Sequence, residues 1–211
     1  MTQTADPGAR ARPPWLWPRA AYLHVPFCAH HCGYCDFAVA AGQDHLQELY
    51  LDALEAELTR LREPQPVRTL FVGGGTPSHL SVGRLDRLLR LLRRWLPPLP
   101  GHEWTVEANP ESLDADKIAV LAEHGVTRVS LGAQSFQAHL LGVLDRAHDP
   151  EATPRAVELL RGRIGQFSLD LIFAVPGQTD AEWRTDLARA LALAPDHVST
   201  YGLTYEKGTP L

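Results

Sequence analysis

The stretch that decides the fold runs from Tyr22 to Phe37 and reads Tyr-Leu-His-Val-Pro-Phe-Cys28-Ala-His-His-Cys32-Gly-Tyr-Cys35-Asp-Phe. It contains all three cysteines of the 211-residue chain, in a C-x3-C-x2-C spacing. An odd, tightly grouped set of cysteines does not suit a disulfide framework. The spacing therefore predicts that Cys28, Cys32 and Cys35 bind metal as thiolates in a reducing cytosol.

Two kinds of metal site fit three thiolates at this spacing. A four-iron cluster held by only three cysteines keeps one iron free for another ligand, as a catalytic metal site keeps an open position. A zinc ion would need a fourth ligand to close its tetrahedron, and His24, His30 and His31 are near enough in sequence to supply it. The cysteine motif alone leaves both sites open.

Short β-rich runs alternate with amphipathic helical patterns from Ala20 onward. Six runs predict strands, at Ala20–Val25, Arg68–Val72, Trp104–Ala108, Thr127–Leu131, Phe167–Val175 and His197–Leu203. Capping patterns predict helix starts at Asp44 with Gln47, at Ser81, at Ser112 or Asp114, at Thr153–Pro154, and at Thr179 with Glu182. This alternation predicts an α/β fold of parallel strands joined by crossover helices, as an open doubly wound sheet or a β/α barrel.

Polar residues and glycines gather where the predicted strands end. They are Gly74, Gly75 and Thr76 after the second strand, Glu107 at the end of the third, Gln134 at the end of the fourth, Asp170 within the fifth, Gly202 at the end of the sixth, and Arg146 beyond the fourth. The cysteines follow the first strand. In a β/α barrel the carboxyl ends of the strands share one mouth, whereas a reversed strand order would separate some of them. This distribution favours a partial barrel with one site.

The Tyr22–Phe37 motif resembles the opening of radical S-adenosylmethionine (SAM) proteins, and the run Gly73-Gly-Gly-Thr-Pro77 resembles the segment that contacts SAM in that family. More narrowly, the chain is similar to the oxygen-independent coproporphyrinogen III oxidase family, including its haem chaperone branch. The resemblance implies a partial (β/α)6 barrel with a [4Fe–4S] cluster on the three cysteines and SAM at the open iron. It also implies one-electron chemistry on SAM, with cofactor contacts from the strand-end residues and from Tyr22 and Tyr34. The catalytic residues stay unknown.

One position separates two branches of that family. The dehydrogenases carry a further cysteine two positions after the third, where this chain has Phe37 in Cys35-Asp36-Phe37. The Cys-Asp-Phe form looks like the haem chaperone branch, whose members bind haem and deliver it to haem proteins. We therefore expect a chaperone with haem as cargo, and with acceptor haem proteins and an electron donor as partners. Coproporphyrinogen III dehydrogenase is the alternative, and a zinc-stabilised scaffold without enzymatic activity is a remote one.

Composition bounds the organisation and partners of the chain. Residues 1–19, rich in proline and arginine, predict a disordered tail and not a secretory leader. Residues 20–211 predict one radical SAM core domain, and we expect a further C-terminal portion because the sequence stops just after a strand.

The charge and hydropathy patterns argue against two classes of partner. The net charge of −5 offers no basic field for nucleic acid. No run approaches the roughly 18 apolar residues of a membrane helix, so a cytoplasmic protein is expected.

Four arginines recur at helical spacing and suit either a solvated helix face or peripheral contact with an anionic membrane. They are Arg84, Arg87, Arg90 and Arg94.

Overall fold

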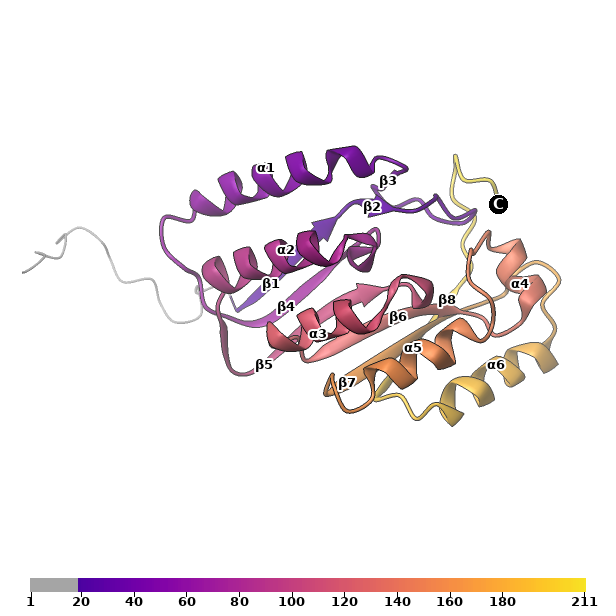
Figure 1. Ribbon diagram of the computed structural model, residues 1–211. Helices are drawn as coiled ribbons and strands as arrows, with labels where there is room; N and C mark the ends of the chain where they lie inside the picture. Colours follow the sequence, from indigo (N-terminus) through magenta and orange to yellow (C-terminus); the bar gives the residue numbers. More distant parts are fainter. Residues whose placement is uncertain (1–18) are drawn as a thin grey trace, which may run out of the picture.

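The computed structural model describes residues 19–211 (Figure 1). The tail expected over residues 1–19 falls outside the described part except for Arg19. The main sheet has six strands, which are β1 (Ala20–Val25), β4 (Val67–Gly74), β5 (Pro98–Ala108), β6 (Arg128–Gln134), β7 (Gln166–Phe173) and β8 (His197–Gly202). Two short strands, β2 (Phe27–Cys28) and β3 (Ala40–Ala41), pair separately.

Helices connect the strands of the main sheet. They are α1 (Gln47–Thr59), α2 (Val82–Trp95), α3 (Ala115–Glu123), α4 (Ala138–Val143), α5 (Ala152–Leu160) and α6 (Asp180–Ala192). Short 3-10 helices η2 (Asp44–Leu46), η3 (Pro77–His79) and η4 (Pro110–Ser112) lie in the loops. All six predicted strands are present, with ends that differ by a few residues.

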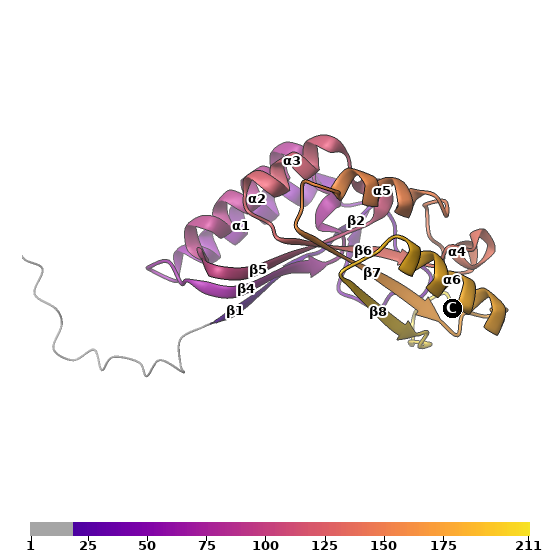
Figure 2. The same cartoon turned by 90° about the horizontal axis from the view of Figure 1, so that it is seen from below.

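The main sheet is an open arc of a β/α barrel. Its strands are all parallel and follow one another in chain order, β1-β4-β5-β6-β7-β8. Helices α1, α2, α3 and α5 lie over one face of the curved sheet (Figure 2). A doubly wound sheet would reverse its strand order and carry helices on both faces. The predicted partial (β/α)6 barrel is confirmed, and the doubly wound alternative is excluded.

The core lies between the helical layer and the sheet. Helix α2 turns a row of leucines onto the strands, and Leu85, Leu88, Leu89 and Leu92 are all fully buried. Trp104 of β5 is the largest fully buried side chain. A second, smaller cluster of Leu140, Leu144, Ile172 and Val175 packs near the carboxyl ends of the late strands. These two clusters fix the sheet edge from which the strand-end residues project.

Capping side chains set three helix starts as the sequence predicts. Ser81 accepts a hydrogen bond from the Arg84 N–H at 3.4 Å. Asp114 accepts one from the Lys117 N–H at 2.8 Å, so it caps α3 in preference to Ser112. Thr179 and Glu182 form a complete capping box at α6.

Two predicted helix starts were wrong. Asp44 lies in η2, and its carboxylate accepts from the Gln47 side chain at 3.0 Å instead of capping α1. Helix α5 begins at Ala152, ahead of the predicted Thr153–Pro154 start. The Asp149 carboxylate accepts from the Glu151 N–H at 2.8 Å and opens the helix earlier. Proline is tolerated in a first turn, where its missing N–H has no helical partner.

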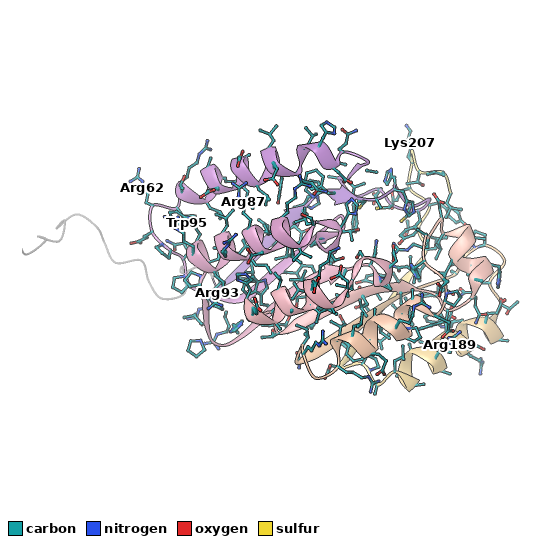
Figure 3. All side chains as sticks on the ribbon, in the orientation of Figure 1. Arg62, Arg87, Arg93, Trp95, Arg189 and Lys207 are labelled. Atoms are coloured by element: carbon teal, nitrogen blue, oxygen red, sulfur yellow. The ribbon has the colours of Figure 1, made fainter. Side chains whose placement is uncertain are left out.

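Two of the four arginines at helical spacing on α2 join this helix to α1. Arg84 pairs with Glu48 at 2.7 Å. Arg87, labelled on α2 in Figure 3, pairs with Asp52 at 2.6 Å. Ion pairs at this level of exposure contribute little to stability. Arg90 is the most exposed of these side chains, at 65%. None of the helices in residues 19–211 has the length and apolar character to cross a bilayer.

Candidate functional site

The cysteine loop lies at the carboxyl end of β1 and is closed at its base by the pairing of β2 with β3. The His24 Nε2–H donates to the Ala38 carbonyl at 2.8 Å, and the Tyr22 hydroxyl donates to His24 Nδ1 at 3.1 Å. The Tyr50 hydroxyl donates to the His24 carbonyl at 2.7 Å. His24 therefore clamps the far end of the loop to the first strand.

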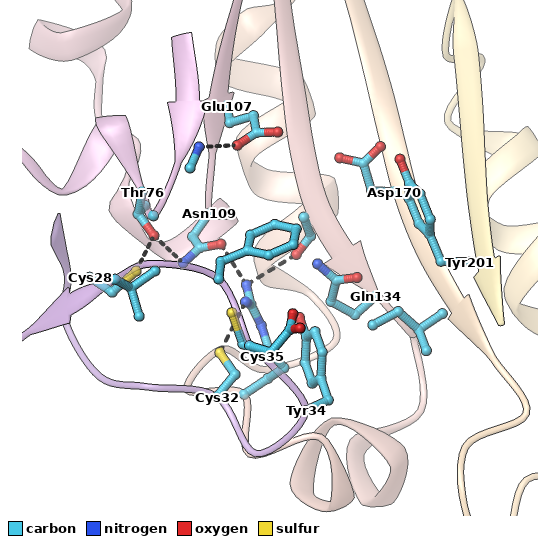
Figure 4. Close-up of a pocket in the computed structure, with 18 of the residues that line it drawn as sticks. Cys28, Cys32, Tyr34, Cys35, Thr76, Glu107, Asn109, Gln134, Asp170 and Tyr201 are labelled. Atoms are coloured by element: carbon cyan, nitrogen blue, oxygen red, sulfur yellow. Dashed lines mark hydrogen bonds between the residues drawn. The ribbon is translucent and has the colours of Figure 1, made fainter. Parts of the chain in front are cut away.

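All three cysteine thiols are free, partly buried, and part of the lining of one cavity of about 420 Å³ (Figure 4). Burial raises the pKa of the Cys28 thiol, and a hydrogen bond with the Thr76 hydroxyl opposes that rise. Burial also raises the pKa of Cys35. Because thiolates are the metal-binding form, loading of this site releases protons.

The same cavity brings together nearly every residue predicted for cofactor binding. Its lining includes Tyr34, Gly74, Gly75, Thr76, Glu107, Gln134, Arg146, Asp170 and Gly202. Tyr34 comes from the cysteine loop, and the others come from strands β4 to β8 or from the loops that follow them (Figure 4). Tyr22 is the exception. Its ring is 60% exposed, packs on Phe71 with 6.0 Å between ring centroids, and lies outside the cavity lining.

The glycine run at the carboxyl end of β4 is required for close packing inside the protein. A Cβ on Gly73 would stand 2.6 Å from the Glu107 carboxylate. Gly74 has a φ of +111°, and a Cβ there would overlap the His24 ring. A Cβ on Gly75 would stand 2.8 Å from the backbone at the start of the cysteine loop. The glycines thus let a carboxylate, an imidazole and the cysteine loop meet at one strand end.

Two carboxylates face the cavity from neighbouring parts of the sheet. Glu107 accepts a hydrogen bond from the Gly74 N–H at 3.0 Å. Asp170 accepts from the Ser130 hydroxyl at 2.8 Å, and Ser168 donates to Ser130 at 2.8 Å. Burial raises the pKa of Glu107, and the negative charge of Asp170 adds to the rise. Each carboxylate keeps lone pairs free for hydroxyl or ammonium groups of a ligand.

Arg146 sits between the cysteine loop and the sheet. Its Nη1 donates to Cys32 Sγ at 3.5 Å, and its Nη2 donates to Asn109 Oδ1 at 2.7 Å and to the Gly132 carbonyl at 3.2 Å. Its Nε is buried and has no hydrogen-bond partner within residues 19–211. If the guanidinium bound a carboxylate in a bidentate manner, some of these Nη hydrogen bonds would be replaced. The Nε–H, in contrast, is already available to donate to an anionic ligand.

Gln134 has a strained backbone conformation, and a neighbouring helix holds the loop that follows it. Its φ is +61°, in the left-handed region that side chains with a Cβ rarely adopt. The loop behind it is pinned by Asp186 of α6, which is fully buried. Asp186 accepts from the Ser135 hydroxyl at 2.6 Å and the Phe136 N–H at 2.9 Å. A helix far along the sequence thus fixes the turn that carries a cavity residue.

The three thiols suit an iron–sulfur cluster. A four-iron cluster takes each thiolate on a different iron, so Cys28, Cys32 and Cys35 need only line a common cavity, as they do.

The rest of the cavity fits SAM. A volume of about 420 Å³ lies in the range of cavities that enclose small ligands. Glu107 and Asp170 suit ribose hydroxyls or an ammonium group, and the buried Arg146 Nε suits a carboxylate. Ile172 and Val39 add apolar surface to the lining.

Comparison with known proteins decides the family. A family model described as Radical SAM superfamily matches residues 22–190. The chain belongs to the radical SAM superfamily. Membership implies a [4Fe–4S] cluster and SAM, and Cys28, Cys32 and Cys35 are the cysteines present to hold that cluster.

Relatives with curated names extend the resemblance to the haem chaperone branch, as the cysteine motif predicted. The chain is 41% identical over 197 residues to heme chaperone HemW of Bacillus subtilis (strain 168), covering 90% of this chain and 52% of that protein. It is 38% identical over 201 residues to heme chaperone HemW of Escherichia coli (strain K12), covering 92% and 53%. The chain therefore spans about half the length of the curated relatives it matches.

Solved structures share the fold of this chain. Coproporphyrinogen III oxidase (HemN) from Escherichia coli, described as a radical SAM enzyme, superposes with a TM-score of 0.82 at 29% identity. That match covers 89% of this chain and 45% of the other. The hydrogenase maturase HydG from Carboxydothermus hydrogenoformans has a TM-score of 0.60 at 18% identity, which shows the fold alone.

Sequence reasoning missed three residues that organise this radical SAM site. Asn109 joins Thr76 to Arg146, Ser130 partners Asp170, and Asp186 supports the Gln134 loop. Asn109 lies two positions beyond Glu107 at the same strand end, so its position in the sequence could have identified it. Asp186 could have been identified only as an acidic residue on the inner face of a predicted helix. Ser130 had no distinguishing pattern.

Replacing Asp186 with alanine is expected to destabilise the protein by about 3 kcal/mol. The change leaves a buried hydroxyl and a buried N–H without their acceptor. The measurement is the urea midpoint of unfolding. Glu158→Ala is the control, because the Glu158 side chain is 74% exposed and its loss should cost less than about 0.5 kcal/mol. Equal midpoints for the two variants would contradict the supporting role of Asp186.

Replacing Glu107 with glutamine is expected to stabilise the metal-free protein at neutral pH. The pKa of Glu107 is raised in the folded state, so ionisation favours unfolding. The penalty is absent below the pKa of an unfolded glutamate, grows as the pH rises above it, and is complete above the folded pKa. Glutamine keeps an acceptor for the Gly74 N–H. Urea midpoints across the acid-to-neutral range test this, and a wild-type protein more stable than E107Q at neutral pH would refute it.

Proposed function

We propose that this protein is a radical SAM haem chaperone, which binds a [4Fe–4S] cluster, SAM and haem and delivers the haem to acceptor haem proteins. The observation that carries the proposal is one cavity of about 420 Å³ that is lined by all three cysteines and by the carboxylates Glu107 and Asp170. Phe37 lines that cavity where the dehydrogenase branch has its further cysteine. The chaperone names of the relatives at 41% and 38% identity support the same assignment.

Different residues of the cavity bind the cluster and the ligand. Cys28, Cys32 and Cys35 hold the cluster beside the end of β1. Glu107 and Asp170 accept hydrogen bonds from ligand hydroxyl or ammonium groups. When bound, the cluster and SAM together supply one-electron chemistry, and the protein supplies positioning and exclusion of water.

The proposed partners follow from this role. Haem is the cargo, haem proteins are the acceptors, and a separate protein donates electrons to the cluster. The proposed location is the cytoplasm, where thiols stay reduced. We propose no membrane contact for the α2 arginines, because Arg84 and Arg87 are paired with acidic residues of α1.

A haem transfer assay tests this function. The full-length protein, reconstituted anaerobically with iron and sulfide, is titrated with haem by absorbance and then mixed with apomyoglobin as a haem acceptor. The proposal predicts that the protein forms a stoichiometric haem complex and that this complex transfers its haem to apomyoglobin. A protein that holds its cluster but binds no haem would contradict the chaperone assignment.

Coproporphyrinogen III dehydrogenase is the second candidate. The superposition on HemN, with its TM-score of 0.82, favours it. The reconstituted protein is supplied with SAM, a reductant and coproporphyrinogen III, and protoporphyrinogen is sought by chromatography. Product would establish the dehydrogenase despite Phe37. No product, from protein whose cluster responds to SAM, leaves haem handling as the function.

A further inference from the structure

A chain of hydrogen bonds joins two of the three cysteines across the cavity. On one side the Thr76 hydroxyl lies 3.5 Å from Cys28 Sγ, and Asn109 Nδ2 donates to Thr76 Oγ1 at 3.2 Å. On the other side Arg146 Nη2 donates to Asn109 Oδ1 at 2.7 Å, and Nη1 donates to Cys32 Sγ at 3.5 Å. Asn109 is the centre of this chain (Figure 4).

The direction of each bond follows from the chemistry of the side chains. A guanidinium can only donate, so the Asn109 oxygen faces Arg146 and the Asn109 amide nitrogen faces Thr76. Because Thr76 Oγ1 accepts from that nitrogen, its own hydrogen is free to point at Cys28. Every bond therefore runs away from Arg146 towards sulfur, and each donor polarises the next.

The backbone of Asn109 is held independently of its side chain. Its N–H donates to the Ser78 hydroxyl at 3.3 Å, and its carbonyl accepts from the Ser112 hydroxyl at 2.7 Å. Pro110 follows it and starts η4. The amide group is thus presented to Thr76 and Arg146 from a fixed position.

We propose that Asn109 is a positioning residue that orients the Thr76 hydroxyl onto Cys28 and holds Arg146 on Cys32, so that both sulfurs receive a hydrogen bond. Hydrogen bonds to cluster sulfurs stabilise the reduced, more negative state and raise the reduction potential. Asn109 therefore sets the potential of the cluster without touching it. This inference rests on the cluster-binding part of the proposed function.

The test is a redox titration of the reconstituted full-length protein, followed by electron paramagnetic resonance (EPR) without SAM. Asn109→Leu and Thr76→Val should each lower the midpoint potential. The double variant should be no lower than Asn109→Leu alone, because Asn109 acts through Thr76 on the Cys28 side. Ser112→Ala is the matched control. It removes a hydrogen bond to the Asn109 backbone, leaves the amide chain intact, and should keep the wild-type potential.

Two results would overturn the proposal. One is an unchanged potential in Asn109→Leu with full iron and sulfide content, and the other is additive shifts in the double variant. If Asn109→Leu assembles no cluster, Asn109→Asp serves instead, since it keeps the shape and the acceptor for Arg146 but has no donor for Thr76. Its potential should fall, with no further change from Thr76→Val in that background. Wild-type protein without iron and sulfide would overturn the proposed function itself.

Discussion

Replacing Cys32 with serine is expected to abolish the cluster. Wild-type protein reconstituted anaerobically should carry about four irons and four sulfides per chain, and Cys32→Ser should carry less than about one of each. Cys28 and Cys35 are the only other cysteines in the 211 residues, so no further thiol within this sequence can replace the lost ligand. The change also removes the sulfur that accepts from Arg146 at 3.5 Å. Iron and sulfide analysis after gel filtration gives the measurement.

His31→Ala is the control for this loss, because His31 is exposed in the same loop and is a candidate ligand only for a zinc site. It should keep full iron and sulfide. Loss of metal in His31→Ala would contradict the three-thiolate assignment and revive a site of three cysteines and one histidine. Thermal unfolding of the metal-free variants, which should match wild type, separates ligand loss from misfolding.

Replacing Gly74 with alanine should destabilise the protein by about 3 kcal/mol, combining backbone strain with overpacking. Gly74 has a φ of +111°, and a Cβ there would overlap the His24 ring. His24 would then move and release the Ala38 carbonyl, which it binds at 2.8 Å. The end of the cysteine loop would lose its clamp, so cluster content should fall as well. Urea unfolding and iron analysis measure the two effects.

Gly83→Ala is the matched control for Gly74→Ala. A Cβ on Gly83 would meet nothing within 4 Å, and the residue lies in the first turn of α2. The change should stabilise the protein by about 0.4–1 kcal/mol through a less flexible unfolded chain, with no change in cluster content. Similar midpoints for the two variants would show that the packing around Gly74 is looser than the structure implies.

The sheet and the gathering of the site could be predicted because both depend on periodic features of the sequence. Each strand is a short apolar run, and parallel strands in chain order bring their carboxyl ends to one edge. Once the cysteines and Glu107 were placed at such ends, their meeting in one cavity followed. The order of the strands, which separates an arc from a doubly wound sheet, was inferred only from where the polar residues fell.

What could not be predicted depends on side-chain direction and on contacts between distant segments. Tyr22 precedes the cysteines in sequence, yet its ring packs across the sheet onto Phe71 of β4 and lies outside the cavity lining. Asp186 reaches Phe136 across 50 positions of sequence, a pairing that no local pattern encodes. The start of α5 was missed because Asp149, outside the predicted capping pattern, accepts from the N–H of the N-cap residue Glu151.

The most direct test of the central claim is the EPR spectrum of the reduced, reconstituted protein with and without SAM, on a sample of known iron, sulfide and zinc content. The three-cysteine site predicts about four irons per chain and a signal that changes when SAM is added, because SAM binds the iron that lacks a cysteine. One zinc per chain without sulfide, or a cluster whose signal ignores SAM, would contradict the claim.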